Sequence, residues 1–488
     1  MNRLSSAIVY QKRAVHAVAV VGAVLLCALF VLFSAQLALA SGAAQETPGE
    51  DGPGAGDSSP SAEGQDFTLF LPAVGNKSES FGYGLQAHMV TRSQAERSMV
   101  TISYLDFTWA KQQINWGLYR DPWTGEISYG VMDQLVVLGM RNEINLLFSV
   151  TSVPAFLTSS DGSQTLDPVA LDSAAYARFV GRVARRYCGT SLKAIEVWNE
   201  PNLQVEWVVN REPNPEEYVA MLALAYQAIK EECPSMKVIS AGLAQTSDNL
   251  PVAMDNFVYL ERMLQAGLLN YVDAVGAHAL GYNVPPWVRW EDACTAIQVY
   301  GNTFTGPCDT PHHSWSFRST LEGYQERLVA FEGDKIPVWV TEFGWAAGGA
   351  YEPGYEYAND NDYYEQADWT VDAFAMMREF DWVETAFLWN LNFRMVADQT
   401  QKAQWGIVEP PDWHPLPVFK AINRLNTTGR KRPTLDDLAA LDATLKAAET
   451  REQTAPVHVP EPVTLVLMAT GLASLAGYTY RQRRREKS

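Results

Sequence analysis

Two short segments, VWNEPN at Val197–Asn202 and WVTEFGW at Trp339–Trp345, share one pattern. Each begins as a run of strand-forming residues and ends on a glutamate that lies among aromatic or amide side chains. The glutamates are Glu200 and Glu342. Parallel α/β folds build their sites at the carboxyl ends of strands, so the pattern predicts two strands of one sheet that carry functional carboxylates.

Strand-like and helix-like stretches alternate around these segments. The stretches expected to form strands are Gly82–His88, Thr108–Gln112, Ile144–Ser149, Ala194–Trp198, Lys237–Ser240, Ala274–His278, Val338–Thr341 and Thr385–Trp389. The stretches expected to form helices are Ser93–Leu105, Tyr129–Met140, Asp172–Tyr187, Pro215–Glu232, Asn256–Gly267, Arg318–Glu332 and Tyr363–Phe380. Eight strands that alternate with helices over roughly 350 residues predict a closed (β/α)8 TIM barrel. A doubly wound open sheet is the rival, but it usually brings a glycine-rich phosphate loop, and the sequence has none.

The barrel is expected to be a single domain between two linkers. All 15 tryptophans fall between Trp109 and Trp413, and we place the globular region at 66–425. Residues 41–65 are mostly small, polar or acidic and cannot bury a core, which predicts a disordered linker. A second linker is expected at 426–458, with a short helix around Leu435–Ala448.

The N-terminal residues 1–40 have the features of a secretory signal peptide. Lys12 and Arg13 precede a long apolar run, and Ala38 and Ala40 supply the small residues that a signal peptidase reads. A retained membrane anchor is the alternative, because the apolar run is long for a signal.

The C-terminal residues 459–488 have a distinctive order. A Pro-Glu-Pro sequence at Pro460–Pro462 leads into the apolar stretch Val463–Tyr480, which arginines from Arg481 to Arg485 follow. The apolar stretch is just long enough to cross a bilayer, with the basic cluster on the cytoplasmic side. This order resembles the PEP-CTERM sorting tail, a surface-targeting signal that a membrane protease removes; a plain C-terminal anchor is the alternative. Either reading implies an exported domain, extracellular or at the cell surface, with transient or retained anchoring.

The charge of the chain excludes one class of partner. Its formal net charge is −19, and both predicted targeting segments are basic, so the exported part is more acidic still. A field of that sign repels phosphate polymers and acidic glycans, which makes nucleic acid a poor partner. Neutral glycans fit better.

Four cysteines remain after the predicted signal, an even number in an oxidising compartment. Cys294 and Cys308 close a short loop rich in Gly, Thr and Pro, and we expect them to pair. Cys188 and Cys233 each end a predicted helix, and either a disulfide between them or two free buried thiols fits the sequence. No Cys/His cluster has the spacing of a zinc site.

The two glutamates also have the right strand numbers for a known arrangement. Glu200 ends the fourth expected strand and Glu342 ends the seventh. In this the chain resembles the clan A glycoside hydrolases, (β/α)8 enzymes in which an Asn-Glu pair closes strand four and a single Glu closes strand seven. The matching residues are Asn199, Glu200 and Glu342, within a resemblance that covers 79–425 and is weak outside these motifs.

The resemblance implies hydrolysis of an oligo- or polysaccharide by double displacement with retention of anomeric configuration. Glu342 would be the nucleophile, and Glu200 would protonate the leaving oxygen and then activate water. Their carboxyls must lie about 5–5.5 Å apart. Asn199 would bind the sugar 2-hydroxyl. No cofactor and no metal are implied. Salt-bridge residues at the barrel rim are the alternative interpretation of the pair.

The same resemblance assigns further residues to the sugar site. Trp389 would form its floor, and His278 matches a histidine that a tyrosine follows two residues later. Here Leu280 stands in the tyrosine's place, so either Tyr282 contacts the nucleophile from the loop instead or the contact is missing. Lys111 lies near where many relatives carry a nucleophile-positioning arginine, and it keeps the charge without the two-pronged geometry.

Other candidates for sugar contacts are aromatic or amide side chains near strand ends. Gln113, Trp116 and Trp345 belong to this group, because an aromatic plane can stack on a pyranose face. The insertions 281–317 and 346–362 are expected to overhang the strand ends and shape the cleft. Two other functions stay open: a transglycosylase that uses the same glutamate pair, and a catalytically silent glycan-binding barrel.

Overall fold

The computed structural model describes residues 81–116, 119, 126–151, 172–207, 211–247, 250–425, 427 and 433–454. The predicted signal peptide, first linker and sorting tail lie outside these residues. Within the described part of the chain, no helix combines the length and the apolar character needed to cross a bilayer.

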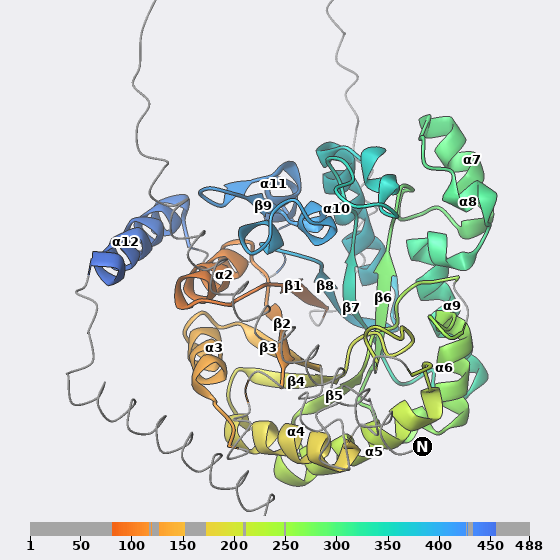
Figure 1. Ribbon diagram of the computed structural model, residues 1–488, viewed down its shortest axis with the longest axis horizontal. Coiled ribbons are helices and arrows are strands. Elements are labelled where there is room, and N and C mark those ends of the chain that lie inside the picture. The colour runs from red at the N-terminus through yellow and green to blue at the C-terminus, as the bar shows by residue number, and fades with distance from the viewer. Residues whose placement is uncertain are drawn as a thin grey trace, which may run out of the picture. The chain divides into compact units, whose positions relative to one another are not determined.

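Eight parallel strands form the centre of the molecule (Figure 1). They are β1 Gly82–Gln86, β2 Trp109–Asn115, β3 Asn145–Thr151, β4 Leu192–Val197, β5 Lys237–Ser240, β6 Val275–Leu280, β7 Val338–Gly344 and β8 Val383–Leu388. Each strand pairs with its sequence neighbours, and β1 pairs with β8. A parallel bridge between Ile239 and Ala274 joins β5 to β6. The predicted (β/α)8 barrel is confirmed.

The helices surround this barrel, each after its strand (Figure 1). They are α2 Arg92–Tyr104, α3 Gly130–Arg141, α4 Ser173–Tyr187, α5 Pro215–Glu232, α6 Asn256–Gln265, α9 Phe317–Ala330, α10 Tyr363–Glu379 and α11 Pro417–Asn423. Local sequence sets their ends. At α5, the Asn214 side chain accepts a hydrogen bond from Glu217 N at 2.9 Å, and Pro215 occupies the first turn.

The predicted second linker is more ordered than expected. Residues Leu435–Thr454 form the helix α12, longer than the short helix that the sequence indicated. Lys446 of α12 pairs with Asp412 at 2.6 Å, so this helix contacts the segment before α11.

Two excursions leave the barrel after β6 and β7. The first contains α7 Trp290–Tyr300, α8 Gly306–Asp309 and the 3-10 turn η3 His313–Trp315; the second contains η4 Glu356–Asn359. The Asp360 carboxylate joins them, because it accepts hydrogen bonds from Asn283 Nδ2 at 3.0 Å and Phe304 N at 2.9 Å. Asn361 Nδ2 donates to Tyr282 O and Ala346 O. The two excursions therefore form one connected structure.

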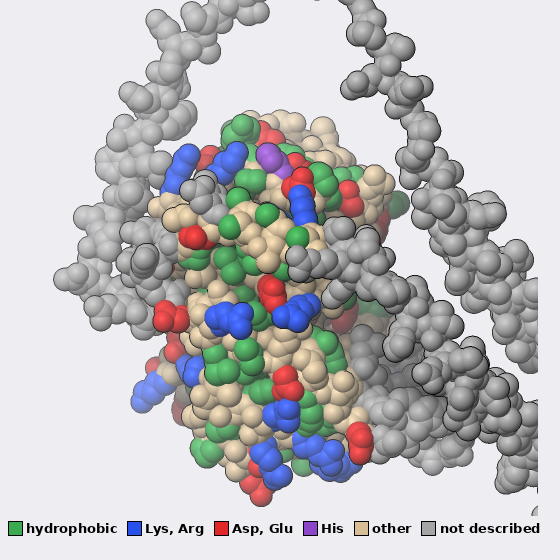
Figure 2. Space-filling view, turned by 90° about the vertical axis from the view of Figure 1, so that its left-hand side faces the viewer, with side chains coloured by type: hydrophobic (Ala, Val, Ile, Leu, Met, Phe, Trp, Pro, Cys, Tyr) green, Lys and Arg blue, Asp and Glu red, His purple; other side chains and the backbone are tan. Residues whose placement is uncertain are grey.

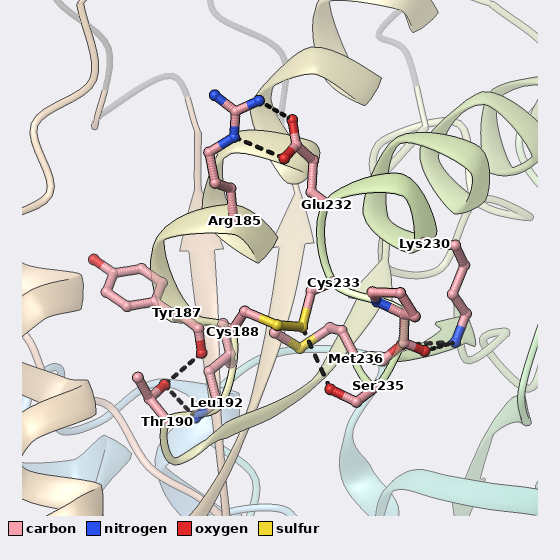
Figure 3. The surroundings of a disulfide bond; sticks show 11 residues. Arg185, Tyr187, Cys188, Thr190, Leu192, Lys230, Glu232, Cys233, Ser235 and Met236 are labelled. Atoms are coloured by element: carbon pink, nitrogen blue, oxygen red, sulfur yellow. Dashed lines mark hydrogen bonds and ion pairs between the residues drawn. A yellow bond between two sulfur atoms is a disulfide. The ribbon is translucent and has the colours of Figure 1, made fainter.

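Both cysteine pairs are disulfides, Cys188–Cys233 and Cys294–Cys308. The first joins the ends of α4 and α5, and Figure 3 shows Arg185 and Glu232 forming a two-pronged ion pair beside it. The second links α7 to α8 within the first excursion. The disulfides therefore tie together two outer helices and one excursion, away from the barrel interior.

Figure 2 shows one face of the molecule, on which basic and acidic side chains lie side by side among apolar and other groups. Ion pairs of this kind join or brace helices, such as Arg186 with Asp133 at 2.7 Å and Arg92 with Glu96 at 2.9 Å. The face drawn in Figure 2 has no broad basic area of the kind that binds a phosphate backbone.

Candidate active site

The interior of the barrel has an apolar part and a charged part. Trp109 and Trp339 pack edge to face, with ring centroids 4.9 Å apart, and Phe387 lies against both. Side chains alternate along a strand, so Lys111, two residues after Trp109, also points inward. Glu196 of β4 meets it there, and both side chains are fully buried. The charged pair of Lys111 and Glu196 thus lies next to the apolar layer of the barrel interior.

Glu342 points into the same interior because β7 contains a β-bulge. The register of β7 against β6 shifts between Val340 and Glu342, so Thr341 is an extra residue without a partner. Trp339 faces the interior and Val340 packs in the outer core. Strict alternation would have pointed Glu342 outward, and the extra residue turns it inward.

Lys111 holds Glu342 from below. Its Nζ lies 3.1 Å from Glu342 Oε1, 3.0 Å from Glu196 Oε2 and 3.2 Å from Thr341 O. Burial raises the pKa of Glu342, but the positive charges of Lys111 and His278 outweigh this effect and the pKa is lowered overall. Burial likewise lowers the pKa of Lys111, and the two carboxylates more than compensate. Glu342 is therefore ionised at neutral pH beside a charged ammonium.

Glu200 lies on a strained turn directly after β4. Trp198 has φ +77° and Glu200 has φ +43°, in the left-handed region that residues other than glycine rarely adopt. Glu200 N donates to Gly242 O at 3.0 Å, which anchors the turn to the end of β5. The turn directs the carboxylate to His278, whose Nδ1 lies 2.9 Å from Glu200 Oε1.

Glu200, Glu342 and His278 form one compact group. One carboxylate oxygen of each glutamate and one ring nitrogen of the histidine all lie within 4.8 Å of one another. Burial lowers the pKa of His278, but the Glu342 charge and the Glu200 hydrogen bond raise it by more, so the pKa is raised overall. The side chains of Glu200 and Glu342 are 21% and 11% exposed, so solvent reaches both while His278 is buried.

Gly242 makes room for this histidine. A Cβ at residue 242 would lie 2.1 Å from His278 Cδ2 and 2.4 Å from its Nε2, far inside contact distance. Gln245, three residues later, donates from Nε2 to Thr320 Oγ1 and accepts from the Leu280 amide. The segment after β5 therefore fixes both the histidine and the end of β6.

Several predicted residues lie around this group. Asn199 is buried beside Glu200, and its Oδ1 has no hydrogen-bond partner in the described ranges. Gln113 lies two residues beyond Lys111 on β2 and is partly exposed. Trp389 directly follows β8, its amide donates to Phe343 O at 2.9 Å, and its partly exposed ring meets the His88 ring edge to face. These three positions lie at the carboxyl ends of the strands.

Three predicted contacts are wrong in this structure. Trp116 and Trp345 are each 1% exposed, and both pack in the core around the barrel. The Trp345 indole donates to Val284 O at 2.8 Å, which fixes it away from the site. Tyr282 does not replace the missing tyrosine, since its hydroxyl donates to Gln245 O at 3.3 Å instead of contacting the nucleophile.

Three side chains near the site escaped the sequence analysis. Glu196 is mid-strand, and His88 and Glu206 follow strands without a recognisable motif. Burial lowers the pKa of His88 to about 4, so its ring is neutral. Burial, followed by the Glu200 charge, raises the pKa of Glu206. One sequence signal could have paired Lys111 with Glu196. Each lies two residues after a side chain of the barrel interior, Trp109 or Ala194, and so points inward as well.

Comparison with known proteins supports the fold. No protein-family model and no curated protein matches this chain. Among solved structures, it is similar to a family 39 glycoside hydrolase from the gut symbiont Bacteroides cellulosilyticus WH2, with TM-score 0.52 and 18% identity over 71% of this chain and 63% of that one. It is also similar to the family 39 enzyme of Xanthomonas axonopodis pv. citri, with TM-score 0.47 and 13% identity over 72% of this chain and 67% of that one. A third is a monomeric β-xylosidase from Caulobacter crescentus CB15, with TM-score 0.47 and 14% identity over 72% and 69%. The similarity to the Bacteroides enzyme shows the (β/α)8 fold alone, and this chain spans less than two thirds of that enzyme.

Proposed function

We propose that this protein is a retaining glycoside hydrolase in which Glu342 is the nucleophile and Glu200 is the acid and base. One observation carries the proposal: oxygens of the two carboxylates lie within 4.8 Å of each other at the open end of the barrel. Retaining enzymes need a separation of about 5–5.5 Å, whereas inverting enzymes need about 6.5–9.5 Å to hold a water between the groups.

Glu342 has the electrostatics of a nucleophile. Its lowered pKa keeps it ionised, with Lys111 Nζ 3.1 Å from one of its oxygens and His278 Nδ1 3.9 Å from the other. It would attack the anomeric carbon and form a covalent glycosyl-enzyme, which splits one difficult step into two easier ones. The buried Lys111 ammonium also stabilises the carboxylate when it leaves again in the second step.

Glu200 has the position of the proton donor. His278 Nδ1 lies 2.9 Å from its Oε1, which holds the carboxyl beside Glu342. Glu200 would give its proton to the leaving oxygen and then take one from the water that hydrolyses the glycosyl-enzyme. The buried Asn199 Oδ1 without a partner is suited to accept a hydrogen bond from a sugar hydroxyl, and Trp389 and Gln113 would supply further contacts.

We further propose that the protein is exported and that its substrate is an extracellular oligo- or polysaccharide. Two disulfides in the described residues support an oxidising compartment. The net charge of −19 disfavours acidic glycans. We also propose that a signal peptidase removes residues 1–40 during export. A membrane protease would act on the sorting tail at 459–488.

A hydrolysis screen over aryl glycosides and soluble polysaccharides tests the function. With an active substrate, proton NMR of the first product should show the anomeric configuration of the substrate. Glu342→Gln should abolish turnover while glycan binding persists. Glu200→Ala should keep its first step on a substrate with an excellent leaving group, and azide should then restore turnover by trapping the glycosyl-enzyme.

The control is Glu379→Gln, the same chemical change at an exposed position at the end of α10, which should leave turnover intact. An inverted first product, or full activity in Glu342→Gln, would refute the double displacement. A wild-type protein that binds glycans without turnover would instead establish the silent barrel, and transfer of sugar to a glycan acceptor faster than to water would establish the transglycosylase.

A further inference from the structure

A second cluster of titratable side chains lies outside the proposed active site. Asp255, His312 and His313 each offer one atom to a group within 4.8 Å. His312 Nε2 lies 3.4 Å and His313 Nε2 lies 3.1 Å from the same oxygen, Asp255 Oδ2. Asp255 precedes α6 and the histidines belong to the excursion after β6, so the cluster joins two segments that are separate in sequence.

Local structure holds these atoms in place. Asp255 Oδ1 caps α6 by accepting hydrogen bonds from Phe257 N at 3.0 Å and Val258 N at 2.9 Å, which leaves Oδ2 directed at the histidines. The His313 ring stacks on Phe257 with centroids 3.7 Å apart. The His312 ring lies against His313 with centroids 4.0 Å apart. Helix capping thus fixes Asp255, and ring stacking fixes the two histidines.

Hydrogen bonding alone leaves this cluster poorly satisfied. Within the described part of the chain, the buried Asp255 Oδ2 receives no well-formed hydrogen bond. The fully buried Asn256 places its Oδ1 3.0 Å from His313 Nε2, so one ring N–H faces two oxygens. The Asn256 Nδ2 has no hydrogen-bond partner among the residues that the structure describes. Buried polar atoms without hydrogen bonds are rare in proteins, and a cation bound by Asp255 Oδ2 and the two ring nitrogens would give that oxygen a partner.

The geometry points to a divalent transition-metal site, and we propose that Asp255, His312 and His313 bind Zn²⁺ or a similar ion. Imidazole and carboxylate are its usual ligands, at about 2.0–2.2 Å, which places neighbouring tetrahedral ligand atoms about 3.3–3.5 Å apart. The 3.1 and 3.4 Å separations are close to that value. His312 Nδ1 lies 2.9 Å from Ser314 Oγ and accepts from Ser314 N at 3.3 Å, so the turn holds this nitrogen while Nε2 faces Asp255.

The catalytic group is a weaker candidate for the same ion. Glu200, His278 and Glu342 also lie within 4.8 Å of one another, but the Lys111 ammonium already contacts Glu342 at 3.1 Å. A divalent ion there would face a buried positive charge. No described lysine or arginine forms an ion pair with Asp255.

The site would fasten the excursion after β6. Trp315 follows the two histidines, and its ring packs edge to face on Tyr282 at 4.8 Å. Ser314 O accepts a hydrogen bond from Gln245 Nε2 at 3.0 Å, which links the cluster to the segment beside His278. A bound ion would therefore clamp the excursion to the start of α6, whatever reaction the barrel performs.

Zinc binding to the full-length protein without a polyhistidine tag tests this proposal. After chelator treatment and desalting, titration calorimetry with ZnCl2 should show one equivalent, Co²⁺ should give the visible absorption of a tetrahedral site, and both ions should raise the melting temperature. Asp255→Asn, which keeps an oxygen for the helix cap, and His312→Gln should each weaken binding by at least about 100-fold.

Two control variants keep the result interpretable. His414→Gln changes an exposed histidine on the short strand β10 (His414–Pro415) and should bind zinc like the wild type. Glu342→Gln removes a ligand from the catalytic group and should also leave binding intact. Absence of a saturable one-equivalent event in the wild type, or equal weakening by His414→Gln or Glu342→Gln, would overturn the proposal without bearing on glycoside hydrolysis.

Discussion

Replacing Lys111 by methionine should change the pH dependence of the reaction as well as its rate. The Lys111 side chain is fully buried, and its ammonium lies 3.1 Å from Glu342 Oε1 and 3.0 Å from Glu196 Oε2. Methionine has a similar length, so the substitution removes the charge and leaves little empty space. Two carboxylates would then share a buried site with no cation between them.

The magnitude follows from these distances. Coulomb's law at 3.1 Å with an effective dielectric constant of about 20 gives an attraction of about 5 kcal/mol for each pair. Desolvation of the ammonium offsets part of it, and removing one partner of a buried pair costs about 3–5 kcal/mol of stability. The variant reduces this cost by binding a proton, so the pKa of Glu342 should rise from its lowered position.

The sign of the pH effect can be worked out from that direction. A carboxyl whose pKa is lowered by folding contributes stability above its unfolded pKa, and this stability is lost as the pH falls through the folded pKa. The wild type should therefore exceed Lys111→Met in stability most at neutral pH, and the difference should shrink in acid. The acidic limb of kcat/KM should move to higher pH in the variant, because Glu342 must be ionised to attack.

The assay is kcat/KM on an aryl glycoside from acidic to neutral pH, with chemical denaturation at the same pH values. At neutral pH we expect a loss in kcat/KM of at least about 100-fold, because an ill-placed or protonated nucleophile loses that much. The control is Lys237→Met, which removes a lysine paired with Glu384 at 2.7 Å and should leave the limb unchanged. A folded Lys111→Met protein with the wild-type acidic limb would refute the reasoning.

Three other changes have defined outcomes. Gly242→Ala should lower kcat by about 10–100-fold with little change in KM, because the new methyl group would lie 2.1 Å from His278 and displace the ring. Steady-state kinetics at neutral pH measure this loss, and an unchanged kcat would contradict the prediction. Trp389→Ala should weaken glycan binding by roughly tenfold, as titration calorimetry in an inactive background can measure, and equal affinity would place this ring outside the sugar site. Removing both cysteines of the disulfide that Cys188 forms should cost about 4 kcal/mol, against about 3 kcal/mol for the disulfide of Cys294, because the sequence separations are 45 and 14; urea denaturation compares them, and the reverse order would contradict the loop-entropy argument.

Much of the fold could be predicted because its signals are local. Apolar runs that end on polar groups marked all eight strands, and β5 and α5 matched to the residue. Predicted strand ends failed where geometry departs from the regular pattern. The prediction stopped β7 at Thr341, whereas the strand continues through the bulge to Gly344. A β-bulge is a feature of how two strands pair, so the sequence of one strand alone does not reveal it.

The sequence predicted the site residues whose motif also indicates where the side chain points. Glu200 and Glu342 come together as their positions at strand ends implied. Trp116 and Trp345 were misassigned because a tryptophan near a strand end looks the same in sequence whether it faces the cleft or the surrounding helices. Glu196 was missed for a different reason: an isolated acid within a strand usually means an exposed face, and its buried partner Lys111 lies 85 residues away on another strand.

The two departures from the resembled family, Lys111 and Leu280, belong to one arrangement around Glu342. Leu280 packs in an apolar group with Tyr282 and offers no hydroxyl at the position where the resemblance implies one. Lys111 compensates because a single ammonium reaches Glu342, Glu196 and the Thr341 carbonyl together, which a planar guanidinium does less readily. Glu196 in turn balances the extra buried charge. A silent binding barrel would have no physical reason to keep a buried lysine and a strained Glu200 turn aligned on one point, so the arrangement favours catalysis.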